Sequence, residues 1–129
     1  MVDRHTYSCW ARIFPAPDLP EQWIAYCLNL GVVSQGNDPM HAAEMVREAC
    51  ALVVADDLNS GFDPLDRNAD PSDWEAFYEL LEHAHGMSVH DIAASGKTMV
   101  LAFDLVARFT NTETSVQIAG RRDAITLAA

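Results

Sequence analysis

The chain has 129 residues, a length that fits one domain, and 50% of them are hydrophobic, which is enough to build one core. Its formal net charge is −11, with 19 Asp and Glu against 8 Lys and Arg. This charge argues against DNA, RNA or an anionic membrane as the main partner, because phosphate groups repel an acidic surface. It favours a basic protein partner, or an acidic surface that only keeps the protein in solution.

The start of the chain and its cysteines indicate the compartment. The sequence Met-Val-Asp-Arg-His carries no apolar signal core, and no run approaches the ~18 apolar residues of a membrane span. Cys9, Cys27 and Cys50 form no Cys-x-x-Cys pair, and each lies in an apolar context that is typical of buried, reduced thiols. We therefore expect a cytoplasmic protein with no membrane partner.

Three strands are predicted before residue 36. Tyr7–Phe14 alternates in polarity and ends at a proline-rich connection, and Trp23–Leu28 and Val32–Gln35 follow at the spacing of an antiparallel meander. In the first strand, one face is predicted to carry Tyr7, Cys9, Ala11 and Ile13, and the other Ser8, Trp10, Arg12 and Phe14.

A long amphipathic helix is predicted next. Asp38 is a favourable N-cap, and Pro39 suits the first helical position, where its missing N–H removes no hydrogen bond. The helix is expected to end near Asn59 or Gly61 and to cover one face of the sheet. Its apolar stripe contains Ala42, Val46, Ala49 and Val53, widened by Ala43, Cys50 and Val54.

The middle of the chain predicts a linker and a second helix. Residues 60–72 contain Gly61, two prolines and scattered Asp, which is typical of a surface linker. A helix is expected over Asp73–His85, capped by Ser72 or Asp73 and ended by Gly86. A short helical turn is expected over Val89–Ala94.

The clearest strand pattern comes after residue 96. Lys97–Phe109 alternates, with Met99, Leu101, Phe103, Leu105, Ala107 and Phe109 on the core face. A turn is expected over Asn111–Thr114, and Val116 and Ile118 mark a last short strand, after which no pattern is clear. The sequence thus predicts one α+β domain over residues 1–129, with a strand–strand–strand–helix–strand sheet, its main helix on one face, a second helix and a C-terminal strand.

The acidic residues are concentrated in one stretch. Arg67 is the only Lys or Arg between Asp56 and Glu82. The stretch spans the expected linker and second helix, so it favours an exposed acidic surface. Its acids are Asp56, Asp57, Asp63, Asp66, Asp70, Asp73, Glu75, Glu79 and Glu82.

The region from Trp23 to Ala49 contains a spaced motif made of Trp23, Ala25, Gln35, Gly36, Asp38, Ala42, Glu48 and Ala49. Through these residues it resembles the HicB family of antitoxins. The resemblance covers about residues 7–58, under half of the chain. Gly36 is placed where a side chain would crowd the turn into the helix, and Ala42 and Ala49 allow that helix to approach the sheet.

This resemblance implies a partial RNase H-like fold that forms homo-oligomers. It also implies a partner, a small basic ribonuclease toxin of HicA type, which an acidic antitoxin would bind and neutralise. Two departures are present. Pro39 and His41 replace the usual Ser/Thr and acidic residue, so no Ser/Thr-x-x-Glu capping box forms. The DNA-binding segment usual at the C-terminus of the family has only Leu80–Gly96 as a candidate here, and its surroundings are acidic.

Catalytic and metal-binding patterns were sought in the sequence. Asp104 lies alone in its strand, and the series Asp63, Asp66 and Asp70 lacks the glycine and terminal Glu of a calcium loop. His83 and His85 would point to different sides of a helix, so zinc binding with His90 needs an irregular backbone. We therefore expect no catalytic, cofactor-binding or metal-binding residues.

Three alternatives for the function remain open. The first is a HicB-like interaction protein, an antitoxin of a type II toxin–antitoxin system. The second is an orphan HicB-like oligomeric regulator that binds DNA through Leu80–Gly96 and has no toxin; a ligand-binding sheet is a third, weaker reading. An exposed strand edge near Tyr7–Arg12 and the strand Lys97–Phe109 are expected to form the dimer surface, with Tyr7, Trp10, Arg12, Val100, Asp104 and Val106.

Overall fold

The computed structural model describes residues 3–84, 98–110, 113–120 and 124–128. Its elements follow the order β-β-β-α-3₁₀-α-β-β-β along the chain. They are β1 (Asp3–Pro15), β2 (Trp23–Cys27), β3 (Val32–Gly36), α1 (Pro39–Asn59), the 3₁₀ helix η1 (Pro64–Arg67), α2 (Pro71–Ala84), β4 (Met99–Phe109), β5 (Glu113–Ile118) and β6 (Ala124–Ala128).

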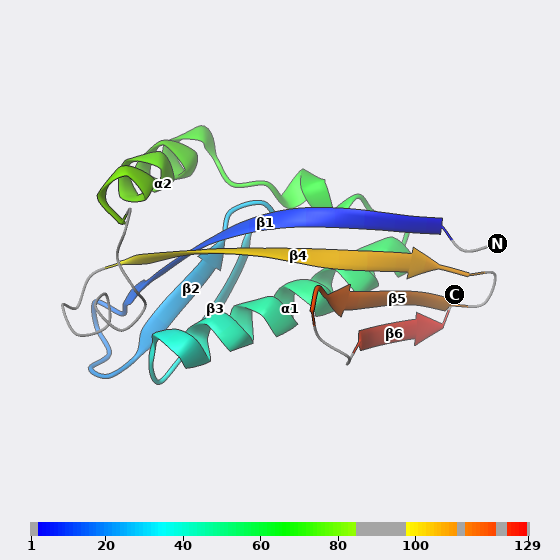
Figure 1. The fold of residues 1–129 in the computed structure, drawn as a ribbon, viewed down its shortest axis with the longest axis horizontal. Helices are drawn as coiled ribbons and strands as arrows, with labels where there is room; N and C mark the ends of the chain where they lie inside the picture. Colours follow the sequence, from blue (N-terminus) through cyan, green and yellow to red (C-terminus); the bar gives the residue numbers. More distant parts are fainter. Residues whose placement is uncertain (1–2, 85–97, 111–112, 121–123, 129) are drawn as a thin grey trace.

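The strands form one antiparallel sheet in the order β3-β2-β1-β4-β5-β6, which confirms the predicted α+β class and its meander. Two long strands, β1 and β4, lie at the centre and pair from Asp3–Phe109 to Ile13–Met99. Helix α1 lies across one face of this sheet, and α2 lies on the opposite face, where Phe77 packs against Trp10 of β1 (Figure 1). The face away from α1 is called the outer face below.

The core lies between α1 and the sheet. The predicted alternation in β1 is confirmed, because Tyr7, Cys9, Ala11 and Ile13 are buried and the intervening side chains are more exposed. The same parity holds in β4, where Phe103, Leu105 and Ala107 are buried. On α1, the most buried positions are Ala42, Ala43, Val46, Cys50, Ala51, Val54 and Ala55, so the predicted Ala49 and Val53 lie on the flank of the stripe.

The junction between β3 and α1 is built as the sequence predicts. Asp38 is the N-cap, and its Oδ1 accepts a hydrogen bond from the N–H of His41 at 2.7 Å. A Cβ on Gly36 would overlap the backbone of His41 and Ala42, approaching the His41 carbonyl carbon to 2.7 Å. A second hydrogen bond at this junction is not predicted from the sequence: His41 Nδ1 accepts the N–H of Asn37 at 2.9 Å. Together with the bond from the His41 N–H to Asp38, it forms a reciprocal pair that resembles a capping box.

Several elements differ from the predictions: β1 begins at Asp3 rather than Tyr7, and β5 begins at Glu113 within the predicted turn. The predicted linker 60–72 contains η1, and α2 begins at Pro71, where the carbonyl of Asp70 accepts the N–H of Asp73 and of Trp74. The predicted cap at Ser72 or Asp73 is therefore wrong, because proline occupies the first turn and moves the helix start toward Asp70. The strand β6 forms where no pattern was clear. The expected stop at Gly86 and turn at 89–94 lie outside the described residues.

Candidate functional site: an acidic segment and a groove beside β1

The segment between α1 and α2 is folded back against the body of the protein. Arg67 reaches the carboxylate of Asp57 with two hydrogen bonds, Nε to Oδ2 at 2.6 Å and Nη2 to Oδ1 at 2.9 Å. The N–H of Phe62 donates to the carbonyl of Asp57, and the N–H of Ala69 donates to the carbonyl of Leu28. These bonds hold residues 57–69 in one arrangement, which is not what the linker prediction implied.

Most acids of this segment remain exposed. Asp57 is buried beneath Arg67 and Asp73 is half-buried, whereas Asp56, Asp63, Asp66, Asp70, Glu75 and Glu79 are exposed. Since Arg67 is bonded to Asp57, the one base of the segment already has a carboxylate partner. The result is a net negative surface that continues from the end of α1 to the outside of α2.

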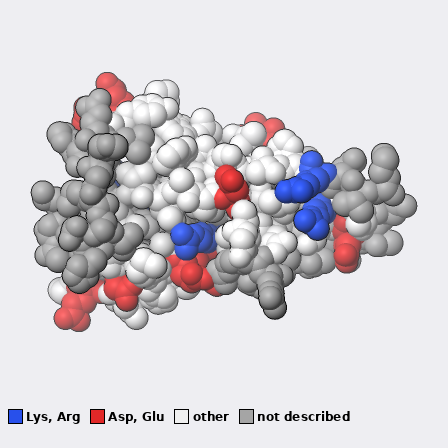
Figure 2. Space-filling view, viewed as in Figure 1, with Lys and Arg blue, Asp and Glu red and all other residues white. Residues whose placement is uncertain are grey.

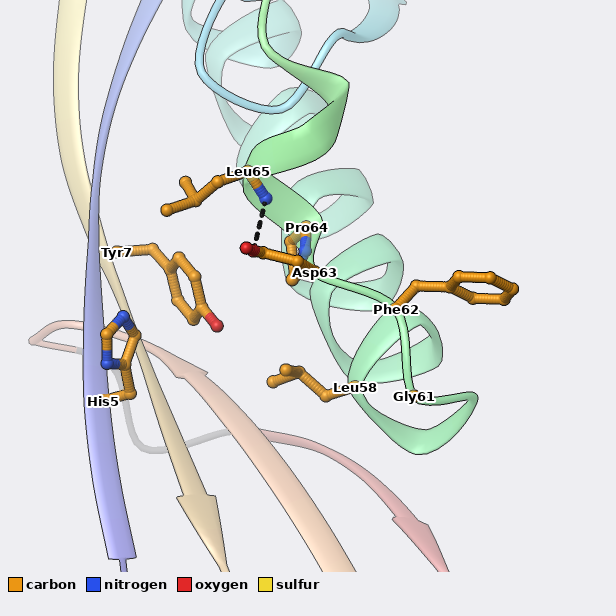
Figure 3. Close-up of a pocket in the computed structure, with 8 residues that line it drawn as sticks. All are labelled: His5, Tyr7, Leu58, Gly61, Phe62, Asp63, Pro64 and Leu65. Carbon is orange, nitrogen blue, oxygen red and sulfur yellow. Dashed lines mark hydrogen bonds between the residues drawn. The ribbon is translucent and has the colours of Figure 1, made fainter.

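A groove of about 500 Å³ separates the segment from β1. Figure 3 shows His5 and Tyr7 extending from β1 toward Leu58, Asp63 and Leu65. Gly61, Phe62 and Pro64 complete its lining, and the Phe62 ring points away from Tyr7. Phe62 and Leu65 are large apolar side chains with 67% and 48% of their area exposed, which is unusual for a segment so rich in Asp.

Tyr7 is a buried part of the groove wall. Its ring packs edge-on against His5, with 4.6 Å between ring centroids. Burial raises the pKa of Tyr7 above its ordinary value, and the negative charge of Asp63 raises it further. Tyr7 is therefore a neutral hydroxyl at ordinary pH, a donor and acceptor between an apolar wall and a carboxylate.

The backbone edge beside this groove has no partner among the described strands. On its β2 side, β1 pairs only over Ala11–Pro15. Trp10 continues that pairing irregularly, because its C=O accepts the N–H of Leu28 and its N–H donates to Asn29 Oδ1 at 2.7 Å. Among the described strands, none pairs with β1 on this side before Trp10. The prediction of an exposed edge at Tyr7–Arg12 is thus wrong for Trp10–Arg12, whose backbone groups on this side are engaged. The unpaired edge lies closer to the start of the strand.

The six residues proposed for a dimer surface do not share one face. Trp10, Arg12, Val100, Asp104 and Val106 belong to the outer face, whereas the Tyr7 side chain is buried on the α1 side. The grouping of Tyr7 with the other five is therefore wrong, because its odd position in β1 directs it to the opposite face. Of the five, Trp10 and Asp104 are exposed and Val106 is buried.

Helix α2 covers part of the outer face. Phe77 is 1% exposed and packs between Trp10 and Trp74, with ring centroids 5.8 and 5.7 Å away. The hydroxyl of Tyr26 donates to Asp73 Oδ2 at 3.2 Å, which ties the start of α2 to β2. Trp10 is therefore engaged within the molecule through one side of its ring.

The motif residues occupy the junction of β2, β3 and α1. Trp23 lies opposite Gly36 in the β2–β3 register, and Gly36 meets the start of α1 at Ala42. Ala25, Gly36 and Ala42 are buried, Trp23 and Ala49 are partly buried, and Gln35 and Glu48 are exposed. The structure gives Gly36 and Ala42 a role in the close approach of the helix to β3, and Asp38 a role in capping it.

Three buried thiols also come together, from β1, β2 and α1. Hydrogen bonds with Cys50 and Cys9, and those from the N–H groups of Leu30 and Asn29, lower the pKa of Cys27, while its burial opposes this. The hydrogen bond to Cys27 and burial raise the pKa of both Cys9 and Cys50. All three thiols are free and within the apolar core.

The remaining chemical candidates are dispersed. Asp104 is exposed on β4, and the Asp63 carboxylate accepts the N–H of Leu65 at 3.0 Å rather than facing Asp66 or Asp70. In the described part of the chain, no three His, Cys, Asp or Glu side chains gather as ligands for a metal ion. Of the DNA-binding candidate Leu80–Gly96, residues 80–84 end α2; the rest, with His85 and His90, lies outside the described residues.

Comparison of the chain with models of protein families, with curated proteins and with solved structures finds no match. Among the described helices, none is long and apolar enough to cross a membrane. The groove is not predicted from the sequence, although the apolar pair Phe62 and Leu65 within an Asp-rich stretch is a signal for it.

Proposed function

We propose that this protein is an acidic protein-binding module of HicB-like type, and that its partner is a small basic protein. The observation that carries the proposal is the exposed acidic segment held against the domain by the Arg67–Asp57 pair, with Phe62 and Leu65 exposed within it. Negative charge attracts a basic partner and accelerates encounter, while exposed apolar side chains supply area that a complex can bury.

In this proposal the partner is a ribonuclease toxin of HicA type and the chain is its antitoxin. The resemblance of residues 7–58 to HicB proteins supports this, as does the net charge of −11. Binding would neutralise the toxin by covering the basic surface with which it holds RNA. The protein itself contributes no reaction step, only an acidic, partly apolar surface.

Co-expression with the product of the adjacent gene, one of the two chains carrying a tag, tests this proposal. We expect a small basic protein to co-purify and its toxicity to be suppressed in cells that make both chains. A neighbour that is not basic, or a basic neighbour that does not co-purify, would contradict the antitoxin assignment.

Self-association through the outer face belongs to the same proposal. Its supporting observation is the exposed area left on β4 beside α2, where Ala102 and Asp104 lie opposite Trp10 and Ser8 in the β1–β4 register. Analytical ultracentrifugation of the purified chain should show a dimer whose proportion falls after Asp104→Lys, because the acid that offsets Arg12 and Arg108 on this face would be replaced by another base. A monomer at high concentration would contradict it.

A further inference from the structure

The direction of the backbone groups in the first half of β1 follows from Trp10. Both its N–H and its C=O point to the β2 side, toward Asn29 and Leu28. Backbone groups alternate along a strand, and the β1–β4 register is unbroken from Asp3 to Ile13. Arg4, Thr6 and Ser8 therefore also direct their N–H and C=O groups to the β2 side, where none of the described strands lies.

The same residues are accessible from solvent. Arg4, Thr6 and Ser8 are all exposed, in contrast to Tyr7 and Cys9 between them. Figure 1 shows β1 and β4 extending well beyond the ends of β2 and β3 on this side. An exposed edge of this kind is a ready template for an added strand, and proteins that do not use such an edge usually cover it or shorten it.

The groove supplies the side-chain contacts that an added strand would need. On the α1 side of the edge, Tyr7, Leu58 and Leu65 offer apolar contacts and Asp63 a carboxylate (Figure 3). On the outer face the edge carries Arg4, directly opposite Arg108 in the register. Figure 2 shows one group of Lys and Arg on that face toward the end of the molecule where β1 begins, and a second group farther along the molecule.

This division of charge selects the side chains of an incoming strand. Lys or Arg is favoured at positions that point into the groove toward Asp63, and an apolar side chain is favoured over Tyr7 and Leu58. At the alternate positions, which point to the outer face near Arg4, neutral side chains are favoured because a base would be repelled.

We propose that an extended segment of the basic partner adds to the sheet as a strand at Arg4–Ser8, with its basic and apolar side chains in the groove. This inference rests on the proposed function, because it names the contact through which that partner binds. Strand addition draws its affinity from main-chain hydrogen bonds and its specificity from alternate side chains, which is what the edge and groove provide.

Two proline variants separate this edge from any other. Thr6→Pro removes an N–H that points to the open side and leaves the β4 pairing intact. Val33→Pro is the matched control on the β3 edge. The N–H of Leu28 points to β1, and because backbone groups alternate along a strand, the N–H of Tyr26 points to β1 as well. Val33 lies opposite Tyr26, so its own N–H points away from the sheet. Circular dichroism and melting temperature establish that both variants fold.

The probe is a short synthetic peptide in which Lys and Val alternate on one face and Thr fills the other. Titrated into the labelled full chain and followed by amide NMR, it should shift and protect the amides of Thr6 and Ser8. Binding should weaken at least tenfold in Thr6→Pro and stay unchanged in Val33→Pro. A peptide with Pro in place of each Thr, which cannot donate to the edge, should not bind.

Several results would overturn the strand addition. These are no binding at millimolar peptide, shifts spread over the acidic side chains without change at Thr6 and Ser8, or equal binding to both proline variants. The amide measurement on the unmodified chain decides the question even if Thr6→Pro does not fold. If Thr6→Pro still captures the basic partner with full affinity in co-expression, the edge proposal fails while the proposed function stands.

Discussion

Arg67 and Asp57 form an ion pair joined by two hydrogen bonds. The Asp57 side chain is buried, with 4% of its area exposed, whereas the Arg67 side chain has 53% of its area exposed. The pair joins the end of α1 to η1 and fixes the loop that carries Phe62 and Asp63. The acidic surface and the groove therefore depend on a contact between one buried acid and the one base of the segment.

This asymmetry predicts unequal effects of removing each partner. Arg67→Ala leaves a buried carboxylate without a charge partner, whereas Asp57→Ala leaves an exposed guanidinium that water can solvate. We expect Arg67→Ala to lower the free energy of unfolding more than Asp57→Ala does, and the double variant to be more stable than Arg67→Ala alone. Urea denaturation of the three variants measures this, and a larger loss in Asp57→Ala would contradict it.

Gly36→Ala should destabilise the protein by about 1–3 kcal/mol, because its new Cβ meets backbone atoms of His41 and Ala42 that cannot rotate away. Gly61→Ala is the matched control. Gly61 has a φ of 80° and open space around its Cβ position, so its cost is the left-handed conformation alone, about 1 kcal/mol. Chemical denaturation should rank Gly36→Ala as the more harmful; the reverse order would refute the close approach.

Asp38→Ala should reduce stability by about 1 kcal/mol, since it removes the acceptor for the N–H of His41 at the start of α1. Asp38→Asn keeps an acceptor oxygen and should restore most of that loss. Thermal unfolding of both variants checks the prediction. An alanine variant as stable as the parent would show that the cap does not matter.

Phe77→Ala should cost about 3–5 kcal/mol, because the ring is buried between Trp10 and Trp74. The change should also loosen α2 from the outer face, which amide hydrogen exchange within α2 would record. Tyr78→Ala, one residue later and 59% exposed, is the control and should cost far less.

The raised pKa of Tyr7 predicts a loss of stability in alkali. Because burial and Asp63 hold the folded-state pKa above the ordinary value of about 10, the unfolded chain releases this proton at lower pH than the folded chain. The stabilisation is complete below about pH 10 and declines as the pH rises toward the folded-state pKa. Tyr7→Phe should flatten this decline in a series of denaturation curves; an unchanged slope would contradict it.

Local signals in the sequence predict the first part of the fold well. Alternation in β1 and β4, and the Asp38-Pro39 start of α1, depend on neighbouring residues, so they can be read from one segment at a time. The last strand was missed because β6 is held by its pairing with β5 at Val116–Ile125, a contact between segments rather than a local pattern.

The candidate site was harder to predict for the same reason. The concentration of acids was visible, but Arg67 bonds to a residue ten positions earlier, and that contact converts an apparent linker into a fixed wall. The position of Tyr7 on the buried face follows from strand parity, which also separates it from Trp10 and Arg12. The edge at Arg4–Ser8 could be predicted only from the strand order, because it arises where β2 ends and β1 continues without a neighbour among the described strands.

The central claim is that the acidic segment binds a basic protein, and a neutralised variant tests it most directly. Asp63→Asn, Asp66→Asn and Asp70→Asn together remove exposed charges from the segment, while Asp18→Asn, Glu21→Gln and Glu113→Gln make the same change in net charge elsewhere. Calorimetry with the co-purified basic partner should show at least tenfold weaker binding for the first variant and a smaller salt dependence, with near-parental binding for the second. Equal affinities for the two variants would contradict the account.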